Sequence, residues 1–230
     1  MELSEKIFIY DATVNRYRNF LKEWHLQDKG IASRFNLFSI LKINWKEALV
    51  HTPFLAHLLN PQESHSQGDL FYKEFIRTVL SEKAQSIFLN ITQEHLYIKD
   101  EEWIGNGQID IFIHHKDKEN PFVIIIENKI FAGDQYLQLK RYYEYATKNL
   151  RISPDRVKLF YLTPIESTPP DESIEKELKK GLINKGILVP ISYEYHIIKW
   201  LKSCQLIIEA LVVQHSLKQY ILTLESFSYE

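Results

Sequence analysis

GQIDIFI at residues 107–113 and VIIIENK at residues 123–129 carry the clearest pattern in this chain of 230 residues. Both are runs of β-branched and aromatic side chains, which favour buried strands. The polar stretch KDKENP at residues 116–121 lies between them and is typical of a hairpin loop. We therefore expect two buried strands that pair as an antiparallel hairpin.

Charged side chains interrupt both apolar runs. Asp110 lies in the first, and Glu127 and Lys129 lie in the second. Such groups are costly in an apolar strand unless they are paired or bound to an ion. Because side chains alternate along a strand, Glu127 and Lys129 share one face and Asn128 points to the other.

The hairpin register determines whether the acidic residues meet. A hairpin centred between Lys118 and Glu119 places Asp110 directly opposite Glu127. Opposed carboxylates repel, and a divalent cation is the natural way to hold them together. We therefore assign Asp110 and Glu127 as ligands of Mg²⁺ or Mn²⁺, although a simple ion pair on a hairpin surface is the alternative.

An Asp in one strand and Glu-X-Lys in the next resemble the PD-(D/E)XK nuclease superfamily. Ile109 stands where the superfamily's name has a proline. Residues 138–142, QLKRY, resemble the Q-x-x-x-Y element of RecB-like nucleases. The likeness, to a bacterial and phage-type branch, extends from about residue 40 to the end. Its other segments are TPFLAHLLNP at 52–61, HSQG at 65–68, YLTP at 161–164 and the stretch from Ser192 to Leu201.

The resemblance implies roles for further residues. It makes the backbone carbonyl of Asn128 a third metal ligand and places Glu47, from an N-terminal helix, near the metal. Lys129 would orient or help deprotonate the attacking water and stabilise charge on the phosphate. For Glu47 the alternative is a capping box with Asn44, three residues before it.

Gln138 and Tyr142 are four residues apart, so they share a helix face. The resemblance implies that this face meets the active site; in the alternative, Tyr142 is a core residue and Gln138 is half-exposed. His57 is expected to pack on its helix rather than bind metal. His65, in a loop near Gly68, is either a loop side chain or a contact to phosphate or metal.

The order of elements along the chain predicts an α/β fold with a mixed central sheet of four to five strands flanked by helices. This agrees with the restriction-endonuclease-like core that the resemblance implies. Residues 1–230 form one domain, with an N-terminal helical part at 1–85 and the nuclease core and C-terminal helix at 90–230. Strands are expected at 94–98, 108–115, 122–129, 157–162 and 187–191. Helices are expected at 5–27, 35–43, 52–59, 69–83, 134–148, 173–182 and 194–215, with Thr52 as an N-cap and Gly30 as a C-cap. The helix between the third and fourth strands should make that pair parallel, and the first three strands should be antiparallel.

Composition narrows the class of protein. A net charge of −2 argues against a strongly basic nucleic-acid binder but does not exclude a nuclease. Cys204 is the only cysteine, which fits a reducing, cytoplasmic location, and we expect it to be buried on a helix. The sequence has no apparent secretory signal and no apolar run long enough to cross a membrane. A group of basic residues either contacts phosphates or forms a solvated face: Lys140, Arg141, Lys148, Arg151, Arg156 and Lys158.

The resemblance therefore implies a metal-dependent nuclease that hydrolyses phosphodiester bonds of DNA, in defence, restriction or repair. The alternative is a catalytically inactive relative that binds nucleic acid or a partner protein. The sequence does not distinguish an RNA-directed or tRNA-directed nuclease from a DNA-directed one. A homodimer is a further expectation.

Overall fold

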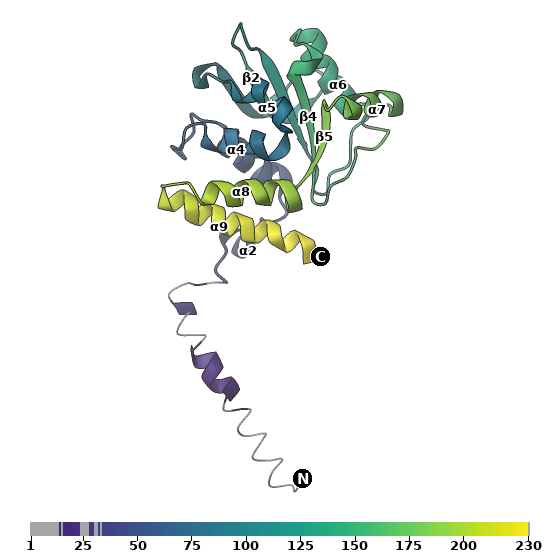
Figure 1. The fold of residues 1–230 in the computed structure, drawn as a ribbon. Coiled ribbons are helices and arrows are strands. Elements are labelled where there is room, and N and C mark those ends of the chain that lie inside the picture. Colours follow the sequence, from purple (N-terminus) through teal and green to yellow (C-terminus); the bar gives the residue numbers. More distant parts are fainter. Residues whose placement is uncertain (1–13, 15, 24–27, 30–31, 33, 230) are drawn as a thin grey trace.

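The computed structural model describes residues 14, 16–23, 28–29, 32 and 34–229 of the chain (Figure 1). One sheet of five strands forms its centre, in the order β1-β2-β3-β4-β5. The strands are β1 Leu96–Trp103, β2 Gln108–His115, β3 Phe122–Asn128, β4 Val157–Thr163 and β5 Leu188–Ser192. Fold class and strand number agree with the sequence-based prediction.

Strand directions follow the connections. β1, β2 and β3 are antiparallel neighbours, and β4 lies parallel to β3 because a helical segment crosses between them. β5 is parallel to β4. Ile111 pairs with Ile126 and His115 with Phe122, so the hairpin is centred between Lys118 and Glu119 as predicted.

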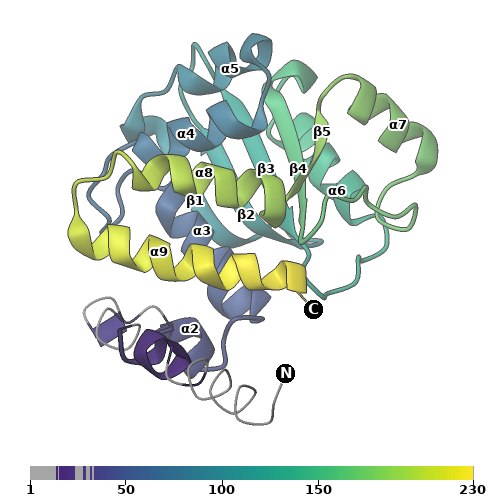
Figure 2. The ribbon, with the colours of Figure 1, turned by 60° about the horizontal axis from the view of Figure 1, so that its bottom comes forward.

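Helices cover both faces of the sheet (Figure 2). The face that carries Ile124 and Ile126 packs against the helices of residues 52–89 and 198–225. The face that carries Ile125 packs against the helices that follow β3 and β4. On the first face lie α3 Thr52–Leu59, α4 Leu70–Val79, α5 Glu82–Leu89, α8 Ile198–Gln205 and α9 Leu211–Glu225. On the second lie α6 Gln138–Glu144, the π-helix η3 Tyr145–Asn149 and α7 Lys176–Asn184.

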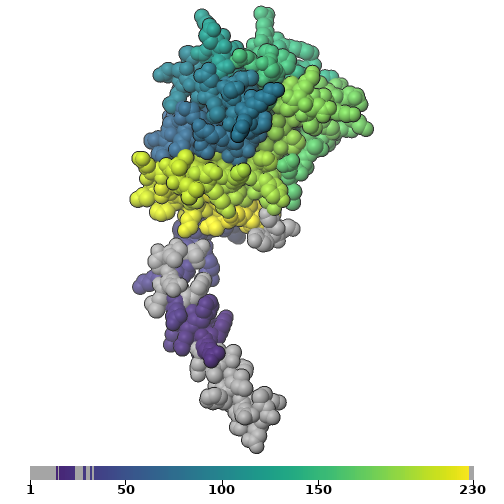
Figure 3. Space-filling model, in the orientation of Figure 1, coloured from purple at the N-terminus to yellow at the C-terminus, as the bar shows by residue number. Residues whose placement is uncertain are grey.

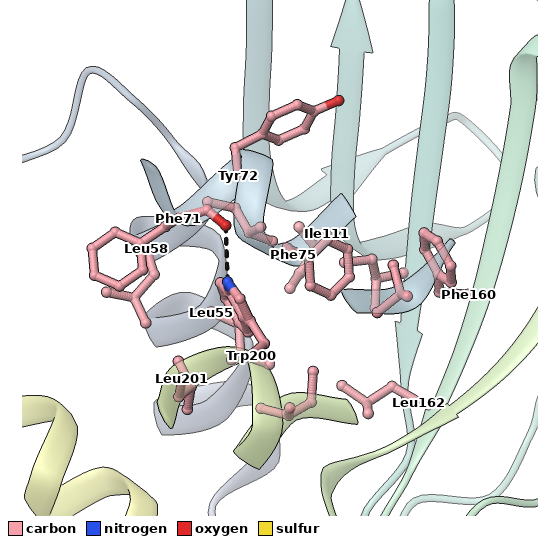
Figure 4. Close-up of a cluster of buried hydrophobic side chains, with 14 of the residues drawn as sticks. Leu55, Leu58, Phe71, Tyr72, Phe75, Ile111, Phe160, Leu162, Trp200 and Leu201 are labelled. Atoms are coloured by element: carbon pink, nitrogen blue, oxygen red, sulfur yellow. Dashed lines mark hydrogen bonds between the residues drawn. The ribbon is translucent and has the colours of Figure 1, made fainter. Parts of the chain in front are cut away.

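Short elements complete the chain: α2 Leu37–Ile40, η1 Glu47–His51, η2 Gln93–His95, η4 Pro154–Arg156, η5 Tyr193–Ile197 and η6 Ser226–Tyr229. The space-filling view shows that the C-terminal helices and the helices of residues 52–89 form one continuous surface (Figure 3). Beneath it, Trp200 of α8 lies fully buried among Phe71, Phe75 and Leu55, and its indole nitrogen donates to the Phe71 carbonyl over 2.8 Å (Figure 4). The segments before and after the central strands therefore share one core.

Several helix predictions were wrong in extent. Thr52 does not cap α3, because η1 runs into that helix without a break. The helix expected at 134–148 begins only at Gln138, and residues 134–137 form a loop. The helix expected at 194–215 is interrupted at residues 206–210, where Ile208 turns into the core at 3% exposure.

Other boundaries shift as well. The helix expected at 35–43 covers only α2, which Asn36 caps by accepting from the Phe38 and Ser39 amides. The range 69–83 divides into α4 and the start of α5, and the helix expected at 173–182 begins only at Lys176. Residues 14 and 16–23 of the helix expected at 5–27 are helical, whereas its remaining residues and the Gly30 cap lie outside the described part of the chain. No helix of the described residues is both long and apolar enough to span a bilayer.

Candidate active site

The predicted charged residues lie at one end of the strands, where β3 ends and β2 begins. Extending the hairpin register by one pair sets Asp110 opposite Glu127. Lys129 follows β3 directly, and its amide donates to the Leu162 carbonyl of β4 over 2.8 Å. β3 is the central strand of the sheet, so its C-terminal end has neighbouring strands on both sides.

Glu127 is fully buried near the end of β3. Its Oε1 lies 2.6 Å from the Lys129 ammonium and accepts from the Gln138 amide over 2.7 Å. Its Oε2 is buried and has no hydrogen-bond partner among the described residues. Burial, together with the charge of Asp110, raises the pKa of Glu127 to about 8, although Lys129 acts in the opposite direction.

Asp110 is held by the last residue of β3. Its Oδ2 accepts from the Asn128 amide over 2.7 Å. Burial raises the pKa of Asp110 to about 6, while this amide and the Lys129 charge oppose the shift. The Lys129 side chain is 10% exposed. Burial alone would lower its pKa, but Glu127 more than compensates, so the ammonium is stabilised.

Glu47 reaches the same end of the strands from the first residue of η1. Its Oε2 accepts from the Ile130 amide over 2.5 Å, one residue after Lys129. The N-cap of η1 is Lys46, and its side chain makes no capping bond. The capping-box alternative for Glu47 was therefore wrong, because the carboxylate faces the end of β3.

Asn128 points to the opposite face of the sheet, as the alternation predicts. Its side-chain amide donates to Thr52 Oγ1 over 3.1 Å, and its carbonyl oxygen accepts from the Tyr193 hydroxyl over 2.9 Å. Asn128 therefore ties the site to α3 and η5. This bond, rather than helix capping, is what Thr52 contributes.

Gln138 and Tyr142 share the face of α6 that covers the site. Gln138 is 3% exposed and Tyr142 is fully buried, so the half-exposed alternative for Gln138 was wrong. The Gln138 amide donates to both Glu127 and the Tyr142 hydroxyl, at 2.7 and 2.9 Å. The Tyr142 hydroxyl donates in turn to the Gln108 carbonyl at the start of β2.

Two neighbouring residues were missed in the sequence. Asp134, which we had placed in a helix, lies in the loop before α6, and its Oδ2 accepts from the Tyr161 hydroxyl over 2.7 Å. Its Oδ1 is buried without a hydrogen-bond partner among the described residues. Tyr161 pairs with Glu127 across β3 and β4. The position of Asp134 between Lys129 and Gln138 was the only signal, since no strand or helix pattern marks it.

The two histidines make local contacts. His57 lies 3.1 Å from Ser64 Oγ and 3.3 Å from Glu63. His65 is buried; Nε2 faces the Asn60 carbonyl at 2.9 Å, and Nδ1 accepts from the Gln67 amide. Both ring nitrogens of His65 are therefore engaged within its own loop.

Most of the basic group between residues 140 and 158 is also engaged internally. Lys140 pairs with Glu175 and Lys148 with Glu144, each at 2.7 Å. Arg141 donates to Gln135 and to the Tyr136 carbonyl, and Arg156 to Asn120. Lys158 is buried and donates to the Gly186 carbonyl. These contacts favour structural roles for the group.

The chemistry of the site suits a hard cation. Carboxylate oxygens from β2, β3, η1 and the 134–137 loop surround one strand end. Two of them, Glu127 Oε2 and Asp134 Oδ1, are buried without a hydrogen-bond partner in the described part of the chain. Mg²⁺ and Mn²⁺ prefer such oxygen ligands. Within the described residues, no three His, Cys, Asp or Glu side chains already form a metal-ready group. Asp110 Oδ2 and Glu47 Oε2 instead accept from the backbone amides of Asn128 and Ile130.

Comparison with known proteins gives one match. A family model of the PD-(D/E)XK nuclease superfamily matches residues 35–223, which include every residue of the site described above. Neither the curated proteins nor the solved structures contain a match.

Proposed function

Because the chain belongs to the PD-(D/E)XK nuclease superfamily, we propose that it is a divalent-metal-dependent nuclease that hydrolyses phosphodiester bonds of DNA. The observation that carries the proposal is the buried pair of Glu127 and Lys129, 2.6 Å apart, beside the Asp110 carboxylate. An isolated ion pair on a hairpin surface would not be buried at the end of the central strand.

The residues that would hold Mg²⁺ or Mn²⁺ are Asp110, Glu127, Glu47 and the backbone carbonyl of Asn128. The bound cation would supply an activated water and neutralise charge on the phosphate. Glu127 Oε2 offers an acceptor that no donor of the described residues occupies.

Lys129 would act directly on the reacting groups. Its ammonium would orient the attacking water and stabilise negative charge that develops on the phosphate. Gln138 would hold Glu127 in place through its amide, and Tyr142 would fasten Gln138 to the start of β2. This chain of contacts keeps the two strand ends and α6 in one arrangement.

The biological setting follows from the same proposal. A DNA-cutting enzyme of this family would serve defence, restriction or repair in the cytoplasm, where the buried thiol of Cys204 stays reduced. Two copies in a homodimer would place two sites on the two strands of a duplex.

Cleavage of a supercoiled plasmid in Mg²⁺ tests the proposal. We expect Asp110→Asn and Lys129→Ala each to lower the cleavage rate by about 10²- to 10⁴-fold, because each removes a charged group from the reacting centre. Lys118→Ala, which changes an exposed lysine in the hairpin loop, is the matched control and should cleave normally. Circular dichroism and urea unfolding verify that each variant folds.

Undiminished cleavage by both site variants would contradict the assignment. Single-stranded DNA and RNA, tested beside the plasmid, identify the substrate. Binding of nucleic acid without cleavage of any substrate would favour the inactive binding module instead.

A further inference from the structure

An aromatic pair lies at the margin of the candidate site. The rings of Trp45 and Phe131 have centroids 5.2 Å apart and are tilted by 57°. Trp45 is two residues before Glu47, and Phe131 directly follows Ile130, whose amide binds the Glu47 carboxylate. The pair is therefore connected to the site from both chain segments that meet there.

Phe131 is 72% exposed, although it touches Trp45. A single exposed apolar side chain is ordinary on a protein surface. Here, however, the exposed ring is two residues from Lys129 and next to the amide that holds Glu47. Core packing does not explain its position, because most of its surface faces solvent.

The other ring is supported from behind. Trp45 stacks on Phe227, with centroids 4.4 Å apart and planes 19° apart. Phe227 in turn contacts His51 and Tyr193 of the core. Trp45 is thereby fixed on the C-terminal part of the chain, and it gives Phe131 a rigid neighbour.

Two lysines lie close to Trp45 in the sequence. Lys42 and Lys46 flank Trp45 in the sequence, and both side chains are exposed. Neither forms an ion pair with a residue in the part of the chain that the structure describes. Exposed aromatic rings next to unpaired cations are the combination that binds single-stranded nucleic acids, through base stacking and phosphate contact.

We propose that Phe131, backed by Trp45, is a stacking subsite for an unpaired base next to the phosphate that the site cleaves. This inference rests on the proposed nuclease function and narrows its substrate to nucleic acid with a single-stranded segment. Bases inside a duplex already stack on their neighbours and present only their edges to the grooves, so a protein ring stacks on an unpaired base without the cost of unstacking a duplex.

Binding measured without cleavage tests the inference separately from catalysis. A short fluorescein-labelled oligothymidylate and a labelled duplex of equal length are titrated with the full chain in EDTA, and fluorescence anisotropy is recorded. We expect tighter binding of the single strand, and a loss of about tenfold in its affinity for Phe131→Ala, as expected for one base–aromatic stack. Phe131→Trp should retain the affinity, and Phe131→Leu should not.

Two controls define the outcome. Phe35→Ala removes another exposed ring, 53% exposed, before α2 and should bind as the wild type does. Lys129→Ala should lose plasmid cleavage but keep its preference for the single strand. Equal affinity of Phe131→Ala and wild type, or a wild-type preference for the duplex, would overturn the stacking subsite even if the wild type cleaves. A wild type that neither binds nor cleaves nucleic acid would reject both proposals.

Discussion

Gln138 connects three parts of the site through one side chain. Its NH₂ group donates to Glu127 and to the Tyr142 hydroxyl, and its carbonyl oxygen accepts from the Gln135 amide over 3.1 Å. All of its polar atoms are used inside the protein. Loss of the amide would therefore leave Glu127 with one charged partner and Tyr142 with one contact fewer.

We expect Gln138→Ala to lower the free energy of unfolding by about 1–3 kcal/mol, because it leaves buried polar groups without partners. Cleavage should also fall, since Glu127 loses the bond that orients it. Urea unfolding and plasmid cleavage measure the two effects. Gln135→Ala is the control: it changes an exposed side chain in the loop directly before α6 and should alter neither quantity strongly. Wild-type behaviour of Gln138→Ala in both assays would remove Gln138 from the site.

At the scale of elements, Trp200 joins α8 to α4. The ring is fully buried, packs edge-on against Phe75 with centroids 5.1 Å apart, and donates to the Phe71 carbonyl. The C-terminal helices are thereby fastened to the helices that precede the sheet. Since η5 leads directly into α8 and carries Tyr193, the partner of Asn128, this packing also supports the strand end that holds the site.

Trp200→Ala should therefore lower the free energy of unfolding by about 3–5 kcal/mol, the usual cost of removing a large buried ring. Trp200→Phe keeps most of the apolar volume and should cost less, chiefly through the lost bond to Phe71. Denaturant unfolding followed by circular dichroism provides the values. Trp103→Ala, at a ring that is 65% exposed, should change stability by less than about 0.5 kcal/mol. Similar losses at Trp200 and Trp103 would refute the central role of this contact.

At the scale of the whole molecule, His51 connects η1 to the C-terminal helix α9. His51, at the end of η1, lies 2.9 Å from the Tyr220 hydroxyl of α9, and its other ring nitrogen lies 2.9 Å from the Asn44 carbonyl. A neutral ring satisfies both contacts if Nε2 donates to the carbonyl and Nδ1 accepts from Tyr220. His51 is fully buried, and burial lowers its pKa to about 4.

This histidine makes global stability depend on pH. Above the unfolded-state pKa of about 6.5, both states are neutral at this position and the full stability is present. As the pH falls from about 6.5 to about 4, the unfolded chain takes up a proton that the folded chain does not, so stability decreases by up to about 3 kcal/mol. Below about 4 this contribution changes no further.

Urea unfolding at a series of pH values between about 7.5 and 4.5 tests the effect. His51→Gln should be less stable than the wild type at neutral pH but should lose less stability on acidification. His215→Gln, at an exposed histidine, should retain the wild-type pH dependence. A pH dependence that is the same in His51→Gln and wild type would show that His51 does not titrate as its burial requires.

The local sequence pattern was sufficient to predict the β2–β3 hairpin. The alternation in β2 and β3 predicted their extents, their pairing register and the separate faces of Glu127 and Asn128. These features depend on residues close in sequence and on turn chemistry, both of which are visible in a linear string. The helices after β3 were less accurate, because buried side chains such as Ile208 end a helix for reasons of packing.

The tertiary structure alone determined which distant residues meet at the site. Glu47 meets the Ile130 amide across 83 positions of the chain, Thr52 meets Asn128 across 76, and Tyr193 reaches the same Asn128 from 65 residues away. Asp134 joins the site only because its loop folds back beside β4. Such contacts depend on how helices dock on the sheet, and docking reflects the summed burial of many side chains rather than any local spacing.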